Sequence, residues 1–221
     1  MPNQALNDVG IRELLLPFIH LEHAGHEVKC LEEFAIYGGA NRADVAALNG
    51  CSHGYEIKSE LDTLERLRRQ VEAYCAVFER ATLVSAPRHL DHIKGIVPDW
   101  WGIIEVRSSD NPDGLLRRTR ESKLNPAPSG VAIASLLWRA ELLDLLSRLG
   151  LDSGVRSKPV EALAGRLAVH VQLDRLSSHV REILRARGEW RSAARLKQCD
   201  DSFQPPSRRS RFRTPYLNIY R

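Results

Sequence analysis

Two carboxylates and one amine in this chain have a spacing that could hold a metal ion. The alternation in GYEIKSE (54–60) predicts a strand, so Glu56 and Lys58 are expected on one face of it. A preceding predicted strand, ADVAALN (43–49), carries Asp44 near its start. If the two strands are neighbours in an antiparallel meander, Asp44 approaches Glu56. Close carboxylates repel each other unless a cation lies between them, and Mg²⁺ prefers such oxygen ligands. An amine beside the metal can stabilise a phosphate's growing charge or activate the attacking water.

The predicted helix over residues 62–79 adds polar residues next to this site. Gln70 and Tyr74 are four residues apart, so they share a helix face that can point back toward the strand. Arg66 and Arg69 lie on the same helix and could contact a DNA backbone, although a solvated helix surface explains them equally well.

The order of the three charged residues resembles a known signature. Asp44, an interval of eleven residues and then Glu56-Ile57-Lys58 are similar to the D-x(n)-(D/E)-x-K motif of the PD-(D/E)XK nuclease superfamily. The sequence departs from the family name in that Ala43, rather than a proline, precedes the aspartate.

A second motif strengthens the resemblance. Gln70 and Tyr74 resemble the Q-x-x-x-Y pattern of RecB-like members, and the likeness covers residues 8–106, about half of the chain. It implies a restriction-endonuclease-like α/β core and a metal-dependent DNA nuclease that hydrolyses phosphodiester bonds, with a role in DNA repair, recombination or defence. The implied enzyme is a Mg²⁺-dependent deoxyribonuclease.

The resemblance also implies roles for individual residues. Asp44 and Glu56 would bind Mg²⁺ or Mn²⁺, Lys58 would activate the water, and Gln70 would orient the lysine or the water. A further acidic ligand is expected from Glu33, with Glu13 as its rival.

Four residues are expected to contact DNA, namely Arg42, Arg66, Arg69 and Tyr74. Arg42 could instead pair with a ligand carboxylate. Two other functions stay open. A nucleic-acid-binding protein could keep the nuclease fold without turnover, and a structural protein could carry Glu56 and Lys58 as a surface ion pair, which predicts no metal dependence.

Composition indicates a globular chain with a core, because 43% of its 221 residues are hydrophobic. No apolar run approaches the ~20 residues of a membrane helix, and the start, MPNQALND, does not resemble a signal peptide, so a cytoplasmic protein without membrane contact is expected. The four cysteines are scattered, which favours free thiols. His53 is expected in a loop.

Charge is uneven along the chain. Residues 151–221 hold 15 Lys and Arg against 7 Asp and Glu, whereas residues 1–150 hold 17 against 21. A polyanion such as DNA would explain this asymmetry, and a solvated helical surface is the alternative.

The predicted elements give an α/β fold class with a helix, an antiparallel meander, a helix and a strand, followed by a C-terminal helical appendage. They are a helix over 8–24, strands over 28–36, 43–49 and 54–60, a helix over 62–79 capped by Asp62 with Glu65, strands over 81–87 and 101–106, and a short helix at HLDHIKGIV between them.

Three domains are expected: a nuclease-like domain over 1–125, a basic helical domain over 126–200 and a basic flexible tail over 201–221. A homodimer would suit an enzyme that cuts both strands of a duplex.

Overall fold

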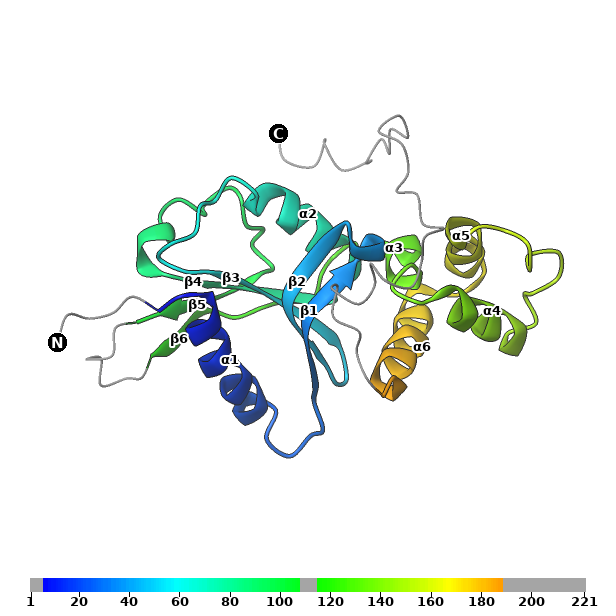
Figure 1. Cartoon of the computed structure of the whole chain (residues 1–221), viewed down its shortest axis with the longest axis horizontal. Helices are drawn as coiled ribbons and strands as arrows, with labels where there is room; N and C mark the ends of the chain where they lie inside the picture. The colour runs from blue at the N-terminus through cyan, green and yellow to red at the C-terminus, as the bar shows by residue number, and fades with distance from the viewer. Residues whose placement is uncertain (1–5, 108–114, 189–221) are drawn as a thin grey trace.

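The computed structural model describes residues 6–107 and 115–188 of the chain. An N-terminal helix, a six-stranded mixed sheet and a C-terminal helical region follow one another (Figure 1). The elements are α1 (Asp8–Glu22), β1 (Lys29–Ile36), η1 (Tyr37–Gly39), β2 (Asn41–Leu48), β3 (Ser52–Lys58), α2 (Leu67–Val77), β4 (Arg80–Ser85), η2 (Pro87–His89), β5 (Gly102–Val106), β6 (Leu116–Arg120), α3 (Gly130–Ala134), α4 (Arg139–Arg148), α5 (Val160–His170) and α6 (Leu173–Ala186).

The sheet keeps its strands in sequence order, from β1 to β6. The strands β1, β2 and β3 form the predicted antiparallel meander, β3, β4 and β5 run parallel, and β6 returns antiparallel to β5. The parallel step from β3 to β4 requires a crossover, which α2 supplies. The predicted α/β class and its order of elements are therefore confirmed.

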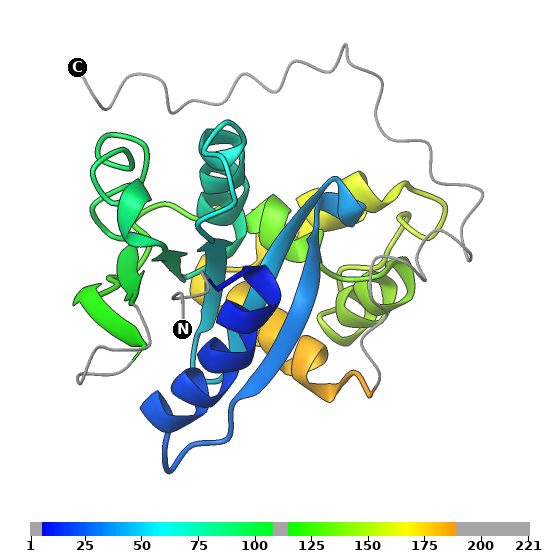
Figure 2. The same ribbon diagram turned by 60° about the vertical axis from the view of Figure 1, so that its left-hand side comes forward.

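Different helices cover the two faces of the sheet: α1 lies on one side of it and α2 on the other (Figures 1 and 2). In α1, Ile11, Leu15 and Ile19 recur every four residues and pack with Tyr55 and Ile57 of β3. The apolar residues of α2 pack on the other face. Alternate residues of β3 therefore point toward different helices.

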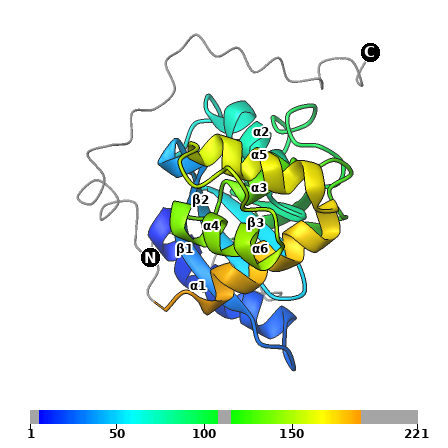
Figure 3. The same cartoon turned by 90° about the vertical axis from the view of Figure 1, so that its right-hand side faces the viewer.

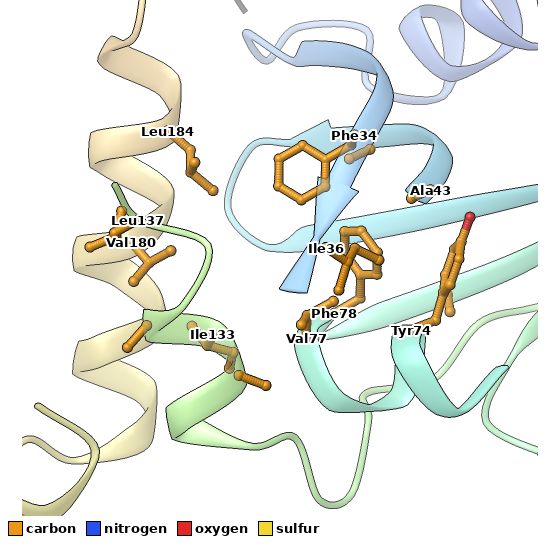
Figure 4. Close-up of a cluster of buried hydrophobic side chains, with 14 of the residues drawn as sticks. Phe34, Ile36, Ala43, Tyr74, Val77, Phe78, Ile133, Leu137, Val180 and Leu184 are labelled. Atoms are coloured by element: carbon orange, nitrogen blue, oxygen red, sulfur yellow. The ribbon is translucent and has the colours of Figure 1, made fainter. Parts of the chain in front are cut away.

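The helical region shares its apolar core with the sheet. Phe34 of β1 and Phe78 belong to the same buried cluster as Ile133 and Leu137 (Figure 4). Viewed from that side, the helices α3 to α6 lie in front of the first three strands (Figure 3). An ion pair between Arg181 of α6 and Glu79, at 2.6 Å, adds a polar contact between the two parts.

Three local predictions need correction. The helix α2 begins at Leu67, not at residue 62, because Asp62 accepts hydrogen bonds from the backbone N–H and the hydroxyl of Ser59 and so closes a turn. The segment HLDHIKGIV (89–97) forms no α-helix, and the short η2 ends at its first residue, His89. His53 lies within β3, where it is buried.

Some predictions concern residues outside the described ranges. The basic tail over 201–221 and Cys199 are among them. Within those ranges Cys30, Cys51 and Cys75 are free thiols. No helix of the described ranges has the length and apolar character needed to cross a membrane.

Candidate functional site

The buried acid–amine pair of β3 forms the centre of the site. Glu56 is fully buried and Lys58 is only 5% exposed, and the amine of Lys58 donates to Oε1 of Glu56 at 2.6 Å. Both side chains lie on the α2 face, since the intervening Ile57 packs on the α1 face. The prediction that Glu56 and Lys58 share one face of the strand is correct. The pair is in the interior, however, and not on the surface as the structural alternative supposed.

Asp44 stands next to this pair on β2. The ladder between β2 and β3 ends with Val45 opposite Tyr55, so one further step in the same register sets Asp44 opposite Glu56. Beyond the end of the ladder a side-chain hydrogen bond joins the two strands: Oδ2 of Asp44 accepts from the backbone N–H of Ile57 at 2.7 Å. The predicted approach of Asp44 to Glu56 follows from the register.

The electrostatics of Asp44 show how unfavourable a second negative charge is here. Burial, and after it the charge of Glu56, raises the pKa of Asp44 to about 7, although the hydrogen bond from Ile57 acts in the opposite direction. Burial also raises the pKa of Glu56, and Lys58 offsets only part of that effect. Both carboxylates would be stabilised as anions by an additional positive charge.

One oxygen of Glu56 has no partner. Oε1 is bonded to Lys58, but Oε2 is buried and has no well-formed hydrogen bond from the described residues. The hydroxyl of Tyr74 is near enough to lower the pKa of Glu56, but its proton is donated to the carbonyl of Tyr55. An unsatisfied carboxylate oxygen in the interior is unfavourable, because it has lost water without gaining a donor. A cation would satisfy this oxygen.

Tyr74 of α2 holds the two strands at the point where their ladder ends. Its hydroxyl donates to the carbonyl of Tyr55 at 3.0 Å and accepts from the backbone N–H of Asp44 at 3.2 Å. The ring rises from α2 toward the strands (Figure 4). Tyr74 is fully enclosed by the core, which is at odds with the predicted contact of this residue with DNA.

Gln70 lies one helical turn before Tyr74. Its Oε1 is buried and has no hydrogen-bond partner among the described residues. Two carboxylates and an amide oxygen are hard oxygen donors of the kind that Mg²⁺ and Mn²⁺ select. No group of three or more His, Cys, Asp or Glu within the described ranges could hold a metal ion, so any cation here would complete its shell with the amide and with water.

Glu33, the predicted third metal ligand, is engaged elsewhere. Its carboxylate pairs with Arg12 of α1 at 2.6 Å and with Arg42 of β2. Arg42 thus pairs with a carboxylate, which is the role that the sequence offered as the alternative to DNA contact. The rival ligand, Glu13, is an exposed residue of α1. Arg12 is not among the residues predicted for the site, and its local signal in the sequence is the spacing of four residues from Asp8, with which it forms an ion pair.

The remaining predicted DNA contacts, Arg66 and Arg69, are exposed at the start of α2. They do not belong to the buried cluster. The structure thus gathers Asp44, Glu56 and Lys58 around the hydroxyl of Tyr74, and leaves the arginines outside.

The family model described as Bacteriophage P4 protein cII matches residues 1–207. The chain belongs to the bacteriophage P4 cII protein family. Protein cII of Enterobacteria phage P4 is 24% identical over 169 residues, which cover 76% of this chain and 64% of that protein. The chain therefore spans slightly less than two thirds of the length of this cII relative.

Among solved structures, a protein of unknown function from Silicibacter pomeroyi, SPO1766, aligns with a TM-score of 0.37 and 19% identity. The alignment covers 70% of this chain and 97% of that one.

The cII match corrects the assignment made from the motifs. The predicted membership of the PD-(D/E)XK nuclease superfamily is wrong, and the predicted function as a DNA nuclease, with its inactive nucleic-acid-binding alternative, is wrong with it. The physical reason is that the motif is short. The motif describes how two strands and a helix meet around a polar site, through Asp44, Glu56, Lys58 and the Gln70–Tyr74 pair. Such a spacing does not by itself establish common descent.

Proposed function

We propose that this cII family member binds a divalent cation, Mg²⁺ or Mn²⁺, between β2, β3 and α2. Asp44 and Glu56 would be its carboxylate ligands, and Gln70 would contribute its amide oxygen. The observation that carries the proposal is the buried Oε2 of Glu56, which has no donor while a second carboxylate stands opposite. Oxygen ligands in this combination favour a hard cation that retains several waters.

Each residue has a defined part in such a site. Lys58 neutralises Glu56 through one oxygen and leaves the other available. Tyr74 fixes the backbone of Asp44 relative to β3, which keeps the two carboxylates in register. A bound cation would supply a more acidic water molecule. The catalytic roles predicted for Lys58 and Gln70, and contact with DNA, stay predictions.

The test is thermal unfolding of the whole protein with Mg²⁺, with Mn²⁺ and with EDTA. A ligand that binds only the folded state at 100 times its Kd stabilises by about 2.7 kcal/mol, which corresponds to a rise in Tm of about 5–10 °C for a chain of this size. Asp44→Asn should abolish the rise. The matched control is Asp91→Asn, because Asp91 is 89% exposed and forms a surface ion pair with Lys94 three residues later.

Two outcomes would contradict the proposal. A rise that persists in Asp44→Asn would place the cation elsewhere. If neither cation changes the Tm of the wild type, Glu56 and Lys58 would form an ion pair without a metal, as the structural alternative predicts.

A further inference from the structure

Three charged side chains converge beside Asp44 without taking part in the proposed cation site. Arg12 and Arg42 come from different elements, α1 and β2, and bind different oxygens of the Glu33 carboxylate. Two guanidinium groups converging on one oxyanion form the arrangement by which proteins hold phosphate. The carboxylate of Glu33 occupies the position that such a ligand would take.

The backbone of Glu33 is unusual. Its φ is 52°, and it is the one residue other than glycine with a positive φ in the described ranges. The ladder from β1 to β2 pairs Glu32 with Val45 and Phe34 with Ala43, and it omits the step at which Glu33 would face Asp44. A non-glycine residue in this region is strained, and such strain persists where the surrounding structure imposes it, often at functional sites.

The two arginines differ in access. Arg42 is 54% exposed and can reach a ligand from solvent. Arg12 is largely covered, and its buried Nε has no hydrogen-bond partner within residues 6–107 and 115–188, so this donor is available there. Burial lowers the pKa of Arg12, but the hydrogen bond to Glu33 and the charges of Asp8 and Asp44 raise it above its usual value. The charge of Asp44, a proposed cation ligand, therefore acts on the guanidinium group of Arg12.

The local charge decides when an anion could bind. Arg12 also lies 2.8 Å from Asp8 and 3.8 Å from Glu32, so the acids around the two arginines outnumber them. A free anion would be repelled. A divalent cation at Asp44 would reverse this balance and would itself attract phosphate oxygens.

We propose that Arg12 and Arg42 form a subsite for a phosphate group beside the cation site, and that Glu33 occupies this subsite until a cation and a phosphate bind together. The proposal rests on the proposed cation site and deepens it by naming the ligand class. Glu33 acts as an internal competitor, because its carboxylate uses the same guanidinium donors.

The experiment is isothermal titration of the full chain with inorganic phosphate, in Mg²⁺ and separately in EDTA. In Mg²⁺ the wild type should bind phosphate, and Arg42→Gln should weaken binding by about tenfold or more, the range of a lost charge-assisted hydrogen bond. Arg148→Gln is the matched control, since Arg148 is 52% exposed and also pairs with a carboxylate, that of Asp144. Glu33→Gln should bind phosphate more tightly than the wild type.

The EDTA arm separates this subsite from the cation site. Glu33→Gln frees the guanidinium donors that the carboxylate uses, and the acids that still pair with Arg12, Asp8 and Glu32, are 41% and 51% exposed and screened by solvent. This variant should therefore bind phosphate without metal, and adding Arg42→Gln to it should abolish the binding. If this holds while Mg²⁺ fails to raise the Tm of the wild type, the subsite stands and the cation proposal is wrong. Equal phosphate affinity in the wild type and Arg42→Gln, or no gain in Glu33→Gln, would overturn the subsite. Circular dichroism of each variant checks that it is folded.

Discussion

The two faces of β3 both bury polar side chains, but they satisfy them differently. On the α1 face, His53 is bonded to the hydroxyl of Thr82 at 2.8 Å and to that of Tyr55 at 3.3 Å. On the α2 face, one oxygen of Glu56 has no hydrogen-bond partner in the described part of the chain, and a second carboxylate, Asp44, stands opposite. One strand thus carries a completed polar network and an incomplete one.

This difference between the two polar networks distinguishes a network that serves packing from one that could serve function. A buried polar group with all its partners contributes to a specific core and needs no ligand. An incomplete network lowers stability, and a natural protein retains it where something else completes it. We therefore expect substitutions on the α1 face to change stability alone, and those on the α2 face to change stability in a cation-dependent way.

The largest effect is expected from Lys58→Met. It leaves the Glu56 charge buried without its amine, and breaking a buried ion pair in this way costs about 3–5 kcal/mol. Urea unfolding in EDTA measures the loss. Saturating Mg²⁺ should recover part of it, because the cation replaces the missing positive charge.

Two variants control this measurement. Replacing both partners, as Glu56→Met with Lys58→Met, should be neutral or stabilising by about 1–4 kcal/mol and should remove the response to Mg²⁺. On the other face, Tyr55→Phe removes one hydrogen bond and should cost about 1 kcal/mol, equally with and without Mg²⁺. An equal loss for Lys58→Met in EDTA and in Mg²⁺ would contradict the distinction between the faces.

The next effect is a pair of opposite pH dependences. The pKa of Asp44 is raised to about 7 by burial and by Glu56, so the folded state holds its proton more tightly than the unfolded state does. The stability from protonated Asp44 is complete below about pH 4 and is lost as pH rises to about 7, by up to about 4 kcal/mol. The difference in unfolding free energy between the wild type and Asp44→Asn should follow this curve in EDTA.

His53 should give the opposite slope. Burial lowers its pKa to about 3, so the folded state disfavours the protonated ring, and stability is lost as pH falls below about 6.5. The loss approaches about 1.4 kcal/mol per pH unit, measured against His53→Gln. Mg²⁺ should flatten the Asp44 curve and leave the His53 curve unchanged. A cation that alters both curves would show that the faces are not independent.

The sequence predicted much of this arrangement from local patterns. Strand alternation put Glu56 and Lys58 on one face, and the meander brought Asp44 toward Glu56, because both features depend on a period of two residues and on short turns. The hydroxyl bridge of Tyr74 and the contact of Arg12 with Glu33 are set by packing between distant segments, which no local period encodes.

The misplaced features have similar causes. His53 follows a turn-rich stretch, and its burial depends on Thr82 from a strand that lies 29 residues further on. The start of α2 was misplaced because Asp62 bonds to Ser59 rather than to the helix. The family assignment failed because five residues describe a local geometry, whereas the cII match extends over residues 1–207.

The smallest effect is expected from Gln70→Ala. The amide oxygen of Gln70 is buried and has no partner among the residues that the structure describes, so its removal relieves an unsatisfied acceptor. Alanine is also the better helix former by a few tenths of a kcal/mol. In EDTA the variant should therefore be as stable as the wild type or more stable, within about 0.5 kcal/mol. In Mg²⁺ the order should reverse, because the variant has lost a ligand and gains less from the cation. Thermal unfolding of both proteins under both conditions checks this crossing. If Gln70→Ala lost stability equally in EDTA and in Mg²⁺, the amide would serve packing alone, and the α2 face would resemble the α1 face at this position.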